Sequence, residues 1–379
     1  MPKELDERYN KPIREAFQTF LRDPEGGKAS VFESLEEAYT DFVERVASGS
    51  GIQDTNANLE QGLEDLTQAS VEAIESGQDE ARGAVENAHQ RGYEAAAAAA
   101  GVSVPDWTPS SDVDPYENAP FDGNIRAFVR GSVEEEISFF EQDLKFIRKY
   151  VDEDEYARAV GQVLARGNDN VKQALARRGI DLDDIPESAL KDEAASVFRN
   201  ASRMGDPDIR GILEEIDPQD LSQRNPRLFQ RIRAHGTDSL PRVMDEVAKD
   251  LAVQSPATKL VEWTLSSRHG SLRSSPDECD VLAGQDLYGF GAGVYHPKTA
   301  PSHPHPNCEC RIAVVTADPE NWGEQGPERP EAFDITEEQI RSNLEEAAGE
   351  RAITDAHVQR VKDMVEGTVS QIHSNPRNS

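Results

Sequence analysis

Residues 268–311 read RHGSLRSSPDECDVLAGQDLYGFGAGVYHPKTAPSHPHPNCECR, and this stretch interrupts a chain that is otherwise patterned as helix. It contains all three cysteines of the 379-residue protein and four of its eight histidines. Thiolate and imidazole groups bind zinc-like metals or serve as nucleophile and base. We therefore expect the chemistry of the protein to lie in this stretch, within a largely helical fold.

The composition is strongly acidic, with 72 Asp and Glu against 40 Lys and Arg and a net charge of −32. In molar salt the Debye length shrinks to about 3 Å, which screens the self-repulsion of such a surface. We therefore expect a protein from a salt-loving host or its virus; an ordinary acidic protein with disordered tails is the alternative. The charge also argues against tight DNA binding, because no basic stripe is present to neutralise phosphates.

The sequence shows neither a membrane span nor a secretion signal. It contains no run of about 18 apolar residues, and Met1 is followed by PKELDERYNKP, which has no apolar signal core. Three cysteines cannot all pair within one chain, which fits a reducing compartment. We expect a protein made and used in the cytoplasm, without membrane contact.

Apolar periodicity predicts a mainly α fold with a long helical N-terminal region at residues 1–101. This region contains two helices within residues 1–48 and a long helix over 56–100, whose apolar seam changes from leucine to alanine and glycine. Small seam residues bury little area, so the long helix needs a partner helix; a partly disordered alanine-rich linker is the alternative. A Pro/Asp-rich linker (102–124) and a helical domain (125–254) follow.

The last third of the chain is predicted to contain a small α+β domain and a C-terminal helical arm. The α+β domain spans residues 255–317, with short strands at Val261–Leu265 and Cys310–Thr316 and loop between them. Residues 318–335 form a second linker. Residues 336–379 form the arm, which opens with capping-box spacing.

The spacing of cysteines and histidines predicts a metal site. His305, Cys308 and Cys310 form an H-x2-C-x-C pattern, and Cys279 lies 29 residues before Cys308. Such a site supplies folding energy to a small domain with little core. His269 and His303 are possible substitutes for His305. Four side chains would complete a tetrahedral structural zinc site: Cys279, His305, Cys308 and Cys310.

Two other interpretations of these residues stay open. The cysteines can be reduced, inert residues in a turn beside surface histidines. Alternatively, Cys308 can be a catalytic nucleophile activated by His305, with Asn307 or Asp280 orienting the imidazole. His305 and Cys308 share one tight proline turn, however, whereas a nucleophile and its base usually come from separate elements. The catalytic arrangement is therefore less favoured.

A wider pattern resembles a known family. It comprises Trp263, CD at 279–280, LAGQD at 282–286, a glycine-rich turn into YHP at 295–297, and HPNCECR at 305–311. This pattern resembles the Mu F-like head morphogenesis family, minor head proteins of tailed phages and archaeal viruses. Its signature domain ends with HPNC, one residue and a second cysteine, followed by an apolar strand. The resemblance covers about residues 255–316, and Glu309 stands where the family often has a basic or neutral residue.

The resemblance implies a minor capsid protein of a halophilic archaeal tailed virus. Such a protein associates with the portal protein and the major capsid protein during head assembly and DNA packaging or ejection. It resides in the virion, inside the head or at the portal vertex, and in the host cytoplasm during assembly. The acidic surface suits proximity to packaged double-stranded DNA without strong direct binding.

No enzymatic activity comes with this resemblance, and we expect a structural and assembly protein. The alternative is a zinc- or cysteine-dependent hydrolase or transferase domain carried on a helical scaffold. A cellular zinc-ribbon-like interaction module is a third interpretation, which the single C-x-C and the long helices favour less.

Overall fold

The computed structural model describes the N-terminal helices and the segments around the Cys/His stretch. The predicted helix over residues 125–151 lies almost entirely outside the described residues, as does the C-terminal arm apart from Arg341. The structure describes residues 2–103, 107–113, 151–165, 168–180, 228–266, 278–284, 290–300 and 310–323, together with Leu144, Ile147, Arg148, Leu182, His269, Asp286 and Arg341.

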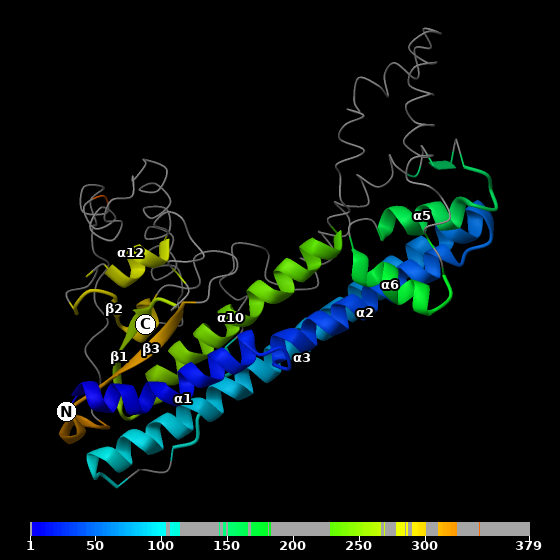
Figure 1. Cartoon of the computed structure of the whole chain (residues 1–379). Coiled ribbons are helices and arrows are strands. Elements are labelled where there is room, and N and C mark those ends of the chain that lie inside the picture. The colour runs from blue at the N-terminus through cyan, green and yellow to red at the C-terminus, as the bar shows by residue number, and fades with distance from the viewer. Residues whose placement is uncertain are drawn as a thin grey trace. The chain divides into compact units, whose positions relative to one another are not determined.

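The fold is mainly α, as the periodicity predicts (Figure 1). The two helices predicted within residues 1–48 are present, and the long third helix begins at Gly51, slightly before the predicted start. No helix in the described ranges is both long and apolar enough to cross a membrane. The larger helices are α1 (Pro2–Arg22), α2 (Gly27–Ala47), α3 (Gly51–Ala100), α5 (Tyr156–Leu164), α6 (Asp169–Arg177) and α10 (Leu228–Gln254).

The chain forms two compact units that are discontinuous in sequence. The sheet-bearing unit comprises residues 1–31, 75–123 and 236–379, and the helical unit comprises residues 32–74 and 124–235. The sequence analysis instead divides the chain into consecutive ranges. The difference arises because α3 is 50 residues long and contributes residues to both units.

The helical unit is held by apolar and aromatic packing around Tyr39 of α2. The ring of Tyr39 lies 5.0 Å, centroid to centroid, from that of Phe229 in α10. Its hydroxyl donates to the carbonyl oxygen of Leu164, at the end of α5, at 3.0 Å. Gly161 lets α5 approach α2, because a Cβ at this position would lie 2.7 Å from the Cβ of Ala47.

In the sheet-bearing unit, the small residues of α3 allow neighbouring helices to come close. A Cβ at Gly92 would lie 2.3 Å from the backbone oxygen of Tyr9 in α1, and one at Gly77 would lie 2.3 Å from the Cγ2 of Val31 in α2. Any larger residue would therefore force the helices apart. This is the close approach that the small seam predicts, and it favours the packed helix over the disordered linker.

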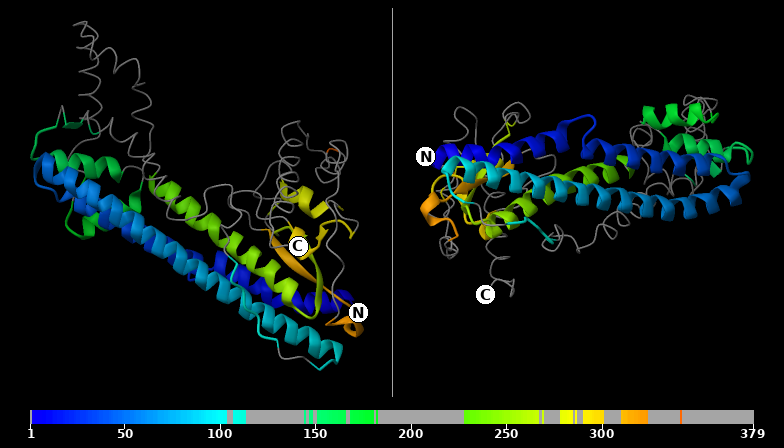
Figure 2. Two further views of the ribbon diagram at one scale, coloured as in Figure 1. Left: turned by 180° about the vertical axis from the view of Figure 1, so that it is seen from behind. Right: turned by 90° about the horizontal axis from the view of Figure 1, so that it is seen from below.

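The sheet has three antiparallel strands in the order β2-β1-β3. In Figure 2 the last strand, in orange, lies beside the N-terminal helix α1, in blue. They are β1 (Thr258–Thr264), β2 (Val294–Tyr295) and β3 (Arg311–Thr316). The two predicted strands correspond to β1 and β3, whereas β2 is too short to give a periodic signal. Alternate residues of one face are buried: Val261, Trp263, Tyr295, Ile312 and Val314.

The segment predicted as loop between these strands contains a short helix, α12 (Glu278–Gly284), and a 3-10 turn, η1 (Pro297–Thr299). The hydroxyl of Tyr295 in β2 donates to the carbonyl oxygen of Leu282 in α12 at 2.6 Å. Gly293 has a φ of +70°, and a Cβ there would lie 2.7 Å from the carbonyl oxygen of Ala283. The glycine-rich turn therefore provides an unusual backbone path beside α12.

Side chains from two helices cap the outer edge of β3, where a fourth strand would otherwise pair. The side-chain amide of Asn10 in α1 takes the place of a neighbouring strand's peptide group, since it donates to the carbonyl oxygen of Val314 at 2.7 Å and accepts the N–H of the same residue. An edge satisfied in this way is protected from pairing with other chains. Three outward N–H groups donate to carboxylate or amide oxygens: Ile312 to Asp245 at 3.2 Å, Val314 to Asn10 at 2.7 Å and Thr316 to Asp6 at 2.7 Å.

Candidate metal centre

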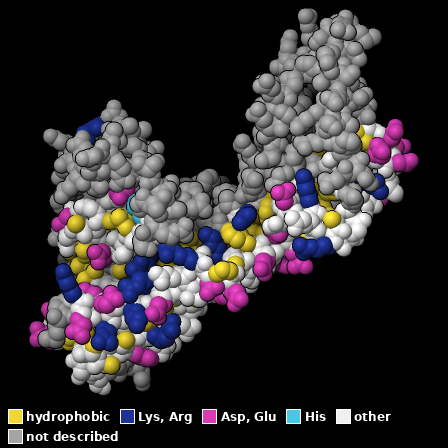
Figure 3. All heavy atoms as spheres, viewed as in Figure 1, with side chains coloured by type: hydrophobic (Ala, Val, Ile, Leu, Met, Phe, Trp, Pro, Cys, Tyr) yellow, Lys and Arg dark blue, Asp and Glu magenta, His cyan; other side chains and the backbone are white. Residues whose placement is uncertain are grey.

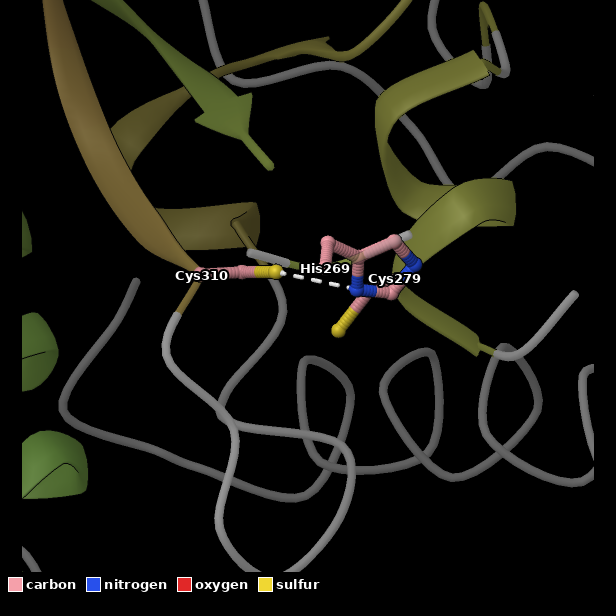
Figure 4. A group of neighbouring side chains, drawn as sticks. All are labelled: His269, Cys279 and Cys310. Carbon is pink, nitrogen blue, oxygen red and sulfur yellow. Dashed lines mark hydrogen bonds between the residues drawn. The ribbon is translucent and has the colours of Figure 1, made fainter. Parts of the chain in front are cut away.

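Three elements of the sheet-bearing unit bring two cysteines and one histidine together (Figure 4). Cys310 directly precedes β3, Cys279 lies in the first turn of α12, and His269 follows β1. All three are buried, with exposed fractions of 2%, 0% and 8%. The cluster, defined here as His269, Cys279 and Cys310, therefore joins segments that are up to 41 residues apart in the sequence.

The distances within the cluster suit a metal ion. The Sγ of Cys310 lies 3.7 Å from the Nδ1 of His269, and the three ligand atoms all lie within 4.8 Å of one another. In a tetrahedral zinc site, neighbouring S and N ligand atoms lie about 3.5–3.8 Å apart. Two thiols and an imidazole are donors that such a metal prefers. The cluster can therefore hold a metal ion.

Asp280 orients the imidazole of His269. Its Oδ2 lies 3.1 Å from the Nε2 of His269, and both side chains are 9% exposed. When Nε2 carries its proton and donates it to this carboxylate, the lone pair of Nδ1 faces the sulfur atoms. A carboxylate behind a histidine ligand fixes the tautomer and makes the imidazole a better ligand. Asp280 thus fits the role of an outer partner in a metal centre.

The predicted ligand set is only partly within the described residues. The structure places Cys279 and Cys310 together, whereas His305, Cys308 and the possible substitute His303 lie outside those residues. The histidine found beside the two thiols is His269, which the sequence analysis names as a substitute for His305. A fourth ligand from residues 301–309 stays a prediction.

Comparison of this chain with known protein families, curated proteins and solved structures finds no match. No protein-family model matches this chain, and neither the curated proteins nor the solved structures contain a match. The resemblance to the Mu F-like family therefore stays a prediction carried by the residues quoted above.

A positive charge lies directly beside the cluster. Burial is the main reason why the pKa of Arg311 is lowered, and the neighbouring charges of Arg14 and Arg22 lower it further. The buried carboxylate of Asp245 and the thiol of Cys310 act in the opposite direction and favour the charged guanidinium. Two cysteines that bind a metal as thiolates gain from such a neighbour, because nearby positive charge stabilises a thiolate.

Sequence reasoning missed the part played by two aspartates. The sequence analysis names Asp280 as an orienting partner for His305 and as part of the family pattern, and it does not single out Asp245. With 72 acidic residues in the chain, no spacing singles these two out. Their shared signal is burial, since Asp245 is 0% and Asp280 8% exposed, and burial follows from the tertiary fold.

Proposed function

We propose that this chain is a structural protein of a tailed-virus head and that a zinc ion bound by the cluster holds its sheet region together. The observation that carries the zinc proposal is the convergence of His269, Cys279 and Cys310, with Asp280 behind the histidine. A metal at this point would link β1, α12 and β3. The sheet has only three strands, two of them six or seven residues long, so such a link would contribute much of its stability.

The burial of the cluster supports a structural role over a catalytic one. Catalytic zinc sites keep one coordination position open to water and substrate. Cys279 and Cys310 are almost completely buried, and His269 is also buried. These features favour a closed site, in which Cys308 or His305 supplies the fourth ligand.

The role in the virus head rests on the HPNCEC segment and on the organisation of the chain around it. Long helices precede a small α+β region, as in the minor capsid proteins that the sequence resembles. In this proposal the protein joins portal and major capsid subunits during head assembly. It lies near packaged double-stranded DNA without binding it strongly, because a net charge of −32 repels phosphates.

The test is incorporation of a tagged chain into virus heads in producing cells, followed by capture in molar salt and mass spectrometry. We expect wild-type protein to be recovered with portal and major capsid subunits. Cys310→Ser should be recovered poorly, because its sheet region would be locally unfolded. His296→Gln is the matched control, since His296 lies in the same stretch outside the cluster, and its side chain accepts the N–H of Lys298 in η1.

The zinc- or cysteine-dependent enzyme predicts the opposite pattern. An enzyme would keep its fold and its partners after Cys310→Ser or Cys308→Ser and would lose only turnover. Recovery of both variants with undiminished head proteins would contradict the structural role of the cluster. Recovery of wild-type protein without portal or capsid subunits would contradict the role in the head.

A further inference from the structure

A pocket of about 210 Å³ lies in the sheet-bearing unit between one face of α1 and the paired ends of β1 and β3. The helix contributes residues at positions 14, 17, 18, 21 and 22, which share one face at helical spacing. The strands contribute Thr264 and Arg311, which are register partners at the last step of the ladder. None of the side chains of the metal cluster lines this pocket.

The charge of the pocket is opposite to that of the protein as a whole. Among the residues that the structure describes, its lining contains Arg14, Arg22 and Arg311 and no aspartate or glutamate. The chain has 72 acidic residues against 40 basic ones, so three arginines around one small pocket are unexpected. In Figure 3 Lys and Arg side chains gather over the region of α1, where acidic side chains are interspersed with them.

The three guanidinium groups differ in how they are held. Arg14 forms an ion pair with Glu7, with Nη2 and Oε1 2.7 Å apart, and Arg22 donates to the hydroxyl of Ser266 at 2.8 Å. The guanidinium of Arg311 is only partly exposed and forms no direct hydrogen bond or ion pair with a residue that the structure describes; Asp245 and Glu262 interact with its charge at longer range. A half-buried cation without a direct partner is costly unless an anion joins it.

We propose that this pocket binds a small oxyanion with the chemistry of phosphate. A single bidentate arginine satisfies a carboxylate, whereas a phosphate dianion offers enough oxygen atoms for several guanidinium groups. The volume lies below the roughly 300 Å³ at which pockets for larger organic ligands begin, so a free ion or a terminal phosphate group fits better than a whole nucleotide. The site depends neither on the metal nor on the role in the virus head.

The experiment is calorimetric titration of the full chain with inorganic phosphate at constant molar sodium chloride. We expect saturable binding that Arg311→Gln weakens at least about tenfold, since a charge-assisted hydrogen bond is lost. Arg8→Gln is the matched control, because Arg8 lies on the same helix, is exposed and, among the described residues, forms an ion pair only with Glu4. This variant should bind phosphate as the wild type does.

A second variant covers the case in which Arg311→Gln fails to fold. Gln18 lines the pocket from the exposed side of α1, so Gln18→Glu adds a negative charge there without disturbing the core. It should bind phosphate at least about tenfold more weakly while keeping the helical circular dichroism of the wild type. Absence of saturable binding to the wild type, or unchanged binding to Gln18→Glu, would overturn the proposal. Acetate that binds as tightly as phosphate would overturn the assigned ligand class.

Discussion

The two units of the chain bury different kinds of polar side chain. Within the described residues, the polar residues that are buried as a whole in the helical unit all carry hydroxyl groups: Thr40, Thr55, Thr67 and Ser70. The three threonines each donate to the carbonyl oxygen one turn earlier in their own helix. The sheet-bearing unit buries serine and threonine residues as well, and in addition it buries ionisable side chains: His89, Asp245, Lys249, His269 and Asp280.

This difference decides what each unit depends on. A hydroxyl that bonds within its own helix has the same partner at any pH and at any metal concentration. Asp245 and His269 have partners from distant segments, namely the N–H of Ile312 and the carboxylate of Asp280. We therefore expect the helical unit to respond mainly to changes of volume and the sheet-bearing unit to metal, acid and loss of single hydrogen bonds.

The largest expected effect is that of metal removal. Zinc contributes on the order of 10 kcal/mol to the folding of small zinc domains, so a strong chelator should expose the amides of β1 and β3 to hydrogen exchange. The amides of α5 and α6 should keep their protection, because no cluster residue lies in the helical unit. Exchange measured by mass spectrometry separates the two regions. Equal loss of protection in both units, or in neither, would contradict this contrast.

Leu35→Ala should destabilise the helical unit, and chelator should not change the size of this effect. Leu35 is 1% exposed in α2 of the helical unit, and its truncation leaves a cavity that costs about 2–5 kcal/mol. Denaturant unfolding should show this loss equally with and without chelator. Val253→Ala is the control, since Val253 is 44% exposed and should lose far less. If the stability loss of Leu35→Ala disappeared on chelation, the stability of the helical unit would depend on the metal, which would contradict the contrast between the units.

Acid should weaken the sheet-bearing unit through His89. Burial lowers the pKa of His89 from 6.5 to about 3, so the folded protein keeps this ring neutral. The unfolded chain takes up the proton below the ordinary histidine pKa, so stability falls with pH over the window from 6.5 down to about 3. At about pH 4.5 the contribution is roughly 2–3 kcal/mol.

The variant His89→Gln isolates this contribution, since glutamine does not titrate. Its free energy of unfolding, measured in molar salt, should fall less steeply with acid than that of the wild type. The carboxylates titrate equally in both proteins, so their contributions cancel in the difference between the two free energies of unfolding. Parallel pH profiles for the two proteins would show that His89 is accessible to protons in the fold.

The smallest expected effect is that of Asn10→Ala at the edge of β3. The substitution leaves both the N–H and the carbonyl oxygen of Val314 without their side-chain partner, at a cost of about 1–3 kcal/mol. Chemical denaturation should show this loss, and exchange at Val314 should quicken. Asn87→Ala is the control, because Asn87 is exposed and its side chain donates to the carbonyl oxygen of Gly83 in its own helix. Equal stability of the two variants would mean that water replaces the Asn10 amide at this edge.

The helices and the two longer strands were predictable because their signal is local. Periodic apolar residues mark α1, α2 and α3, and the β-branched run at 311–316 marks β3. The grouping into units was not predictable, because it depends on how three helices, α2, α3 and α10, are shared between the units. A two-residue strand such as β2 also lacks a period, and its place comes from pairing with Val261 and Glu262.

The location of the candidate site in the sequence was predictable, but the arrangement of its side chains was not. The clustering of thiols and imidazoles identified Cys279 and Cys310, whose convergence needs only that α12 lie near the start of β3. The choice of His269 depends on the aspartate behind it, and no spacing rule selects Asp280 among so many acids. The arginine pocket could not be predicted from the sequence, since Arg311 is far from Arg14 and Arg22 along the chain.

The most direct test of the account is the metal content of the purified chain by native mass spectrometry in a volatile buffer at high ionic strength. The account predicts one zinc per wild-type chain and loss of that zinc in Cys279→Ser and in Cys310→Ser. His296→Gln should retain it, and Cys308→Ser compared with His305→Gln identifies the fourth ligand. A folded wild-type chain without zinc, or Cys310→Ser with a full complement, would contradict the claim that the cluster is a metal centre.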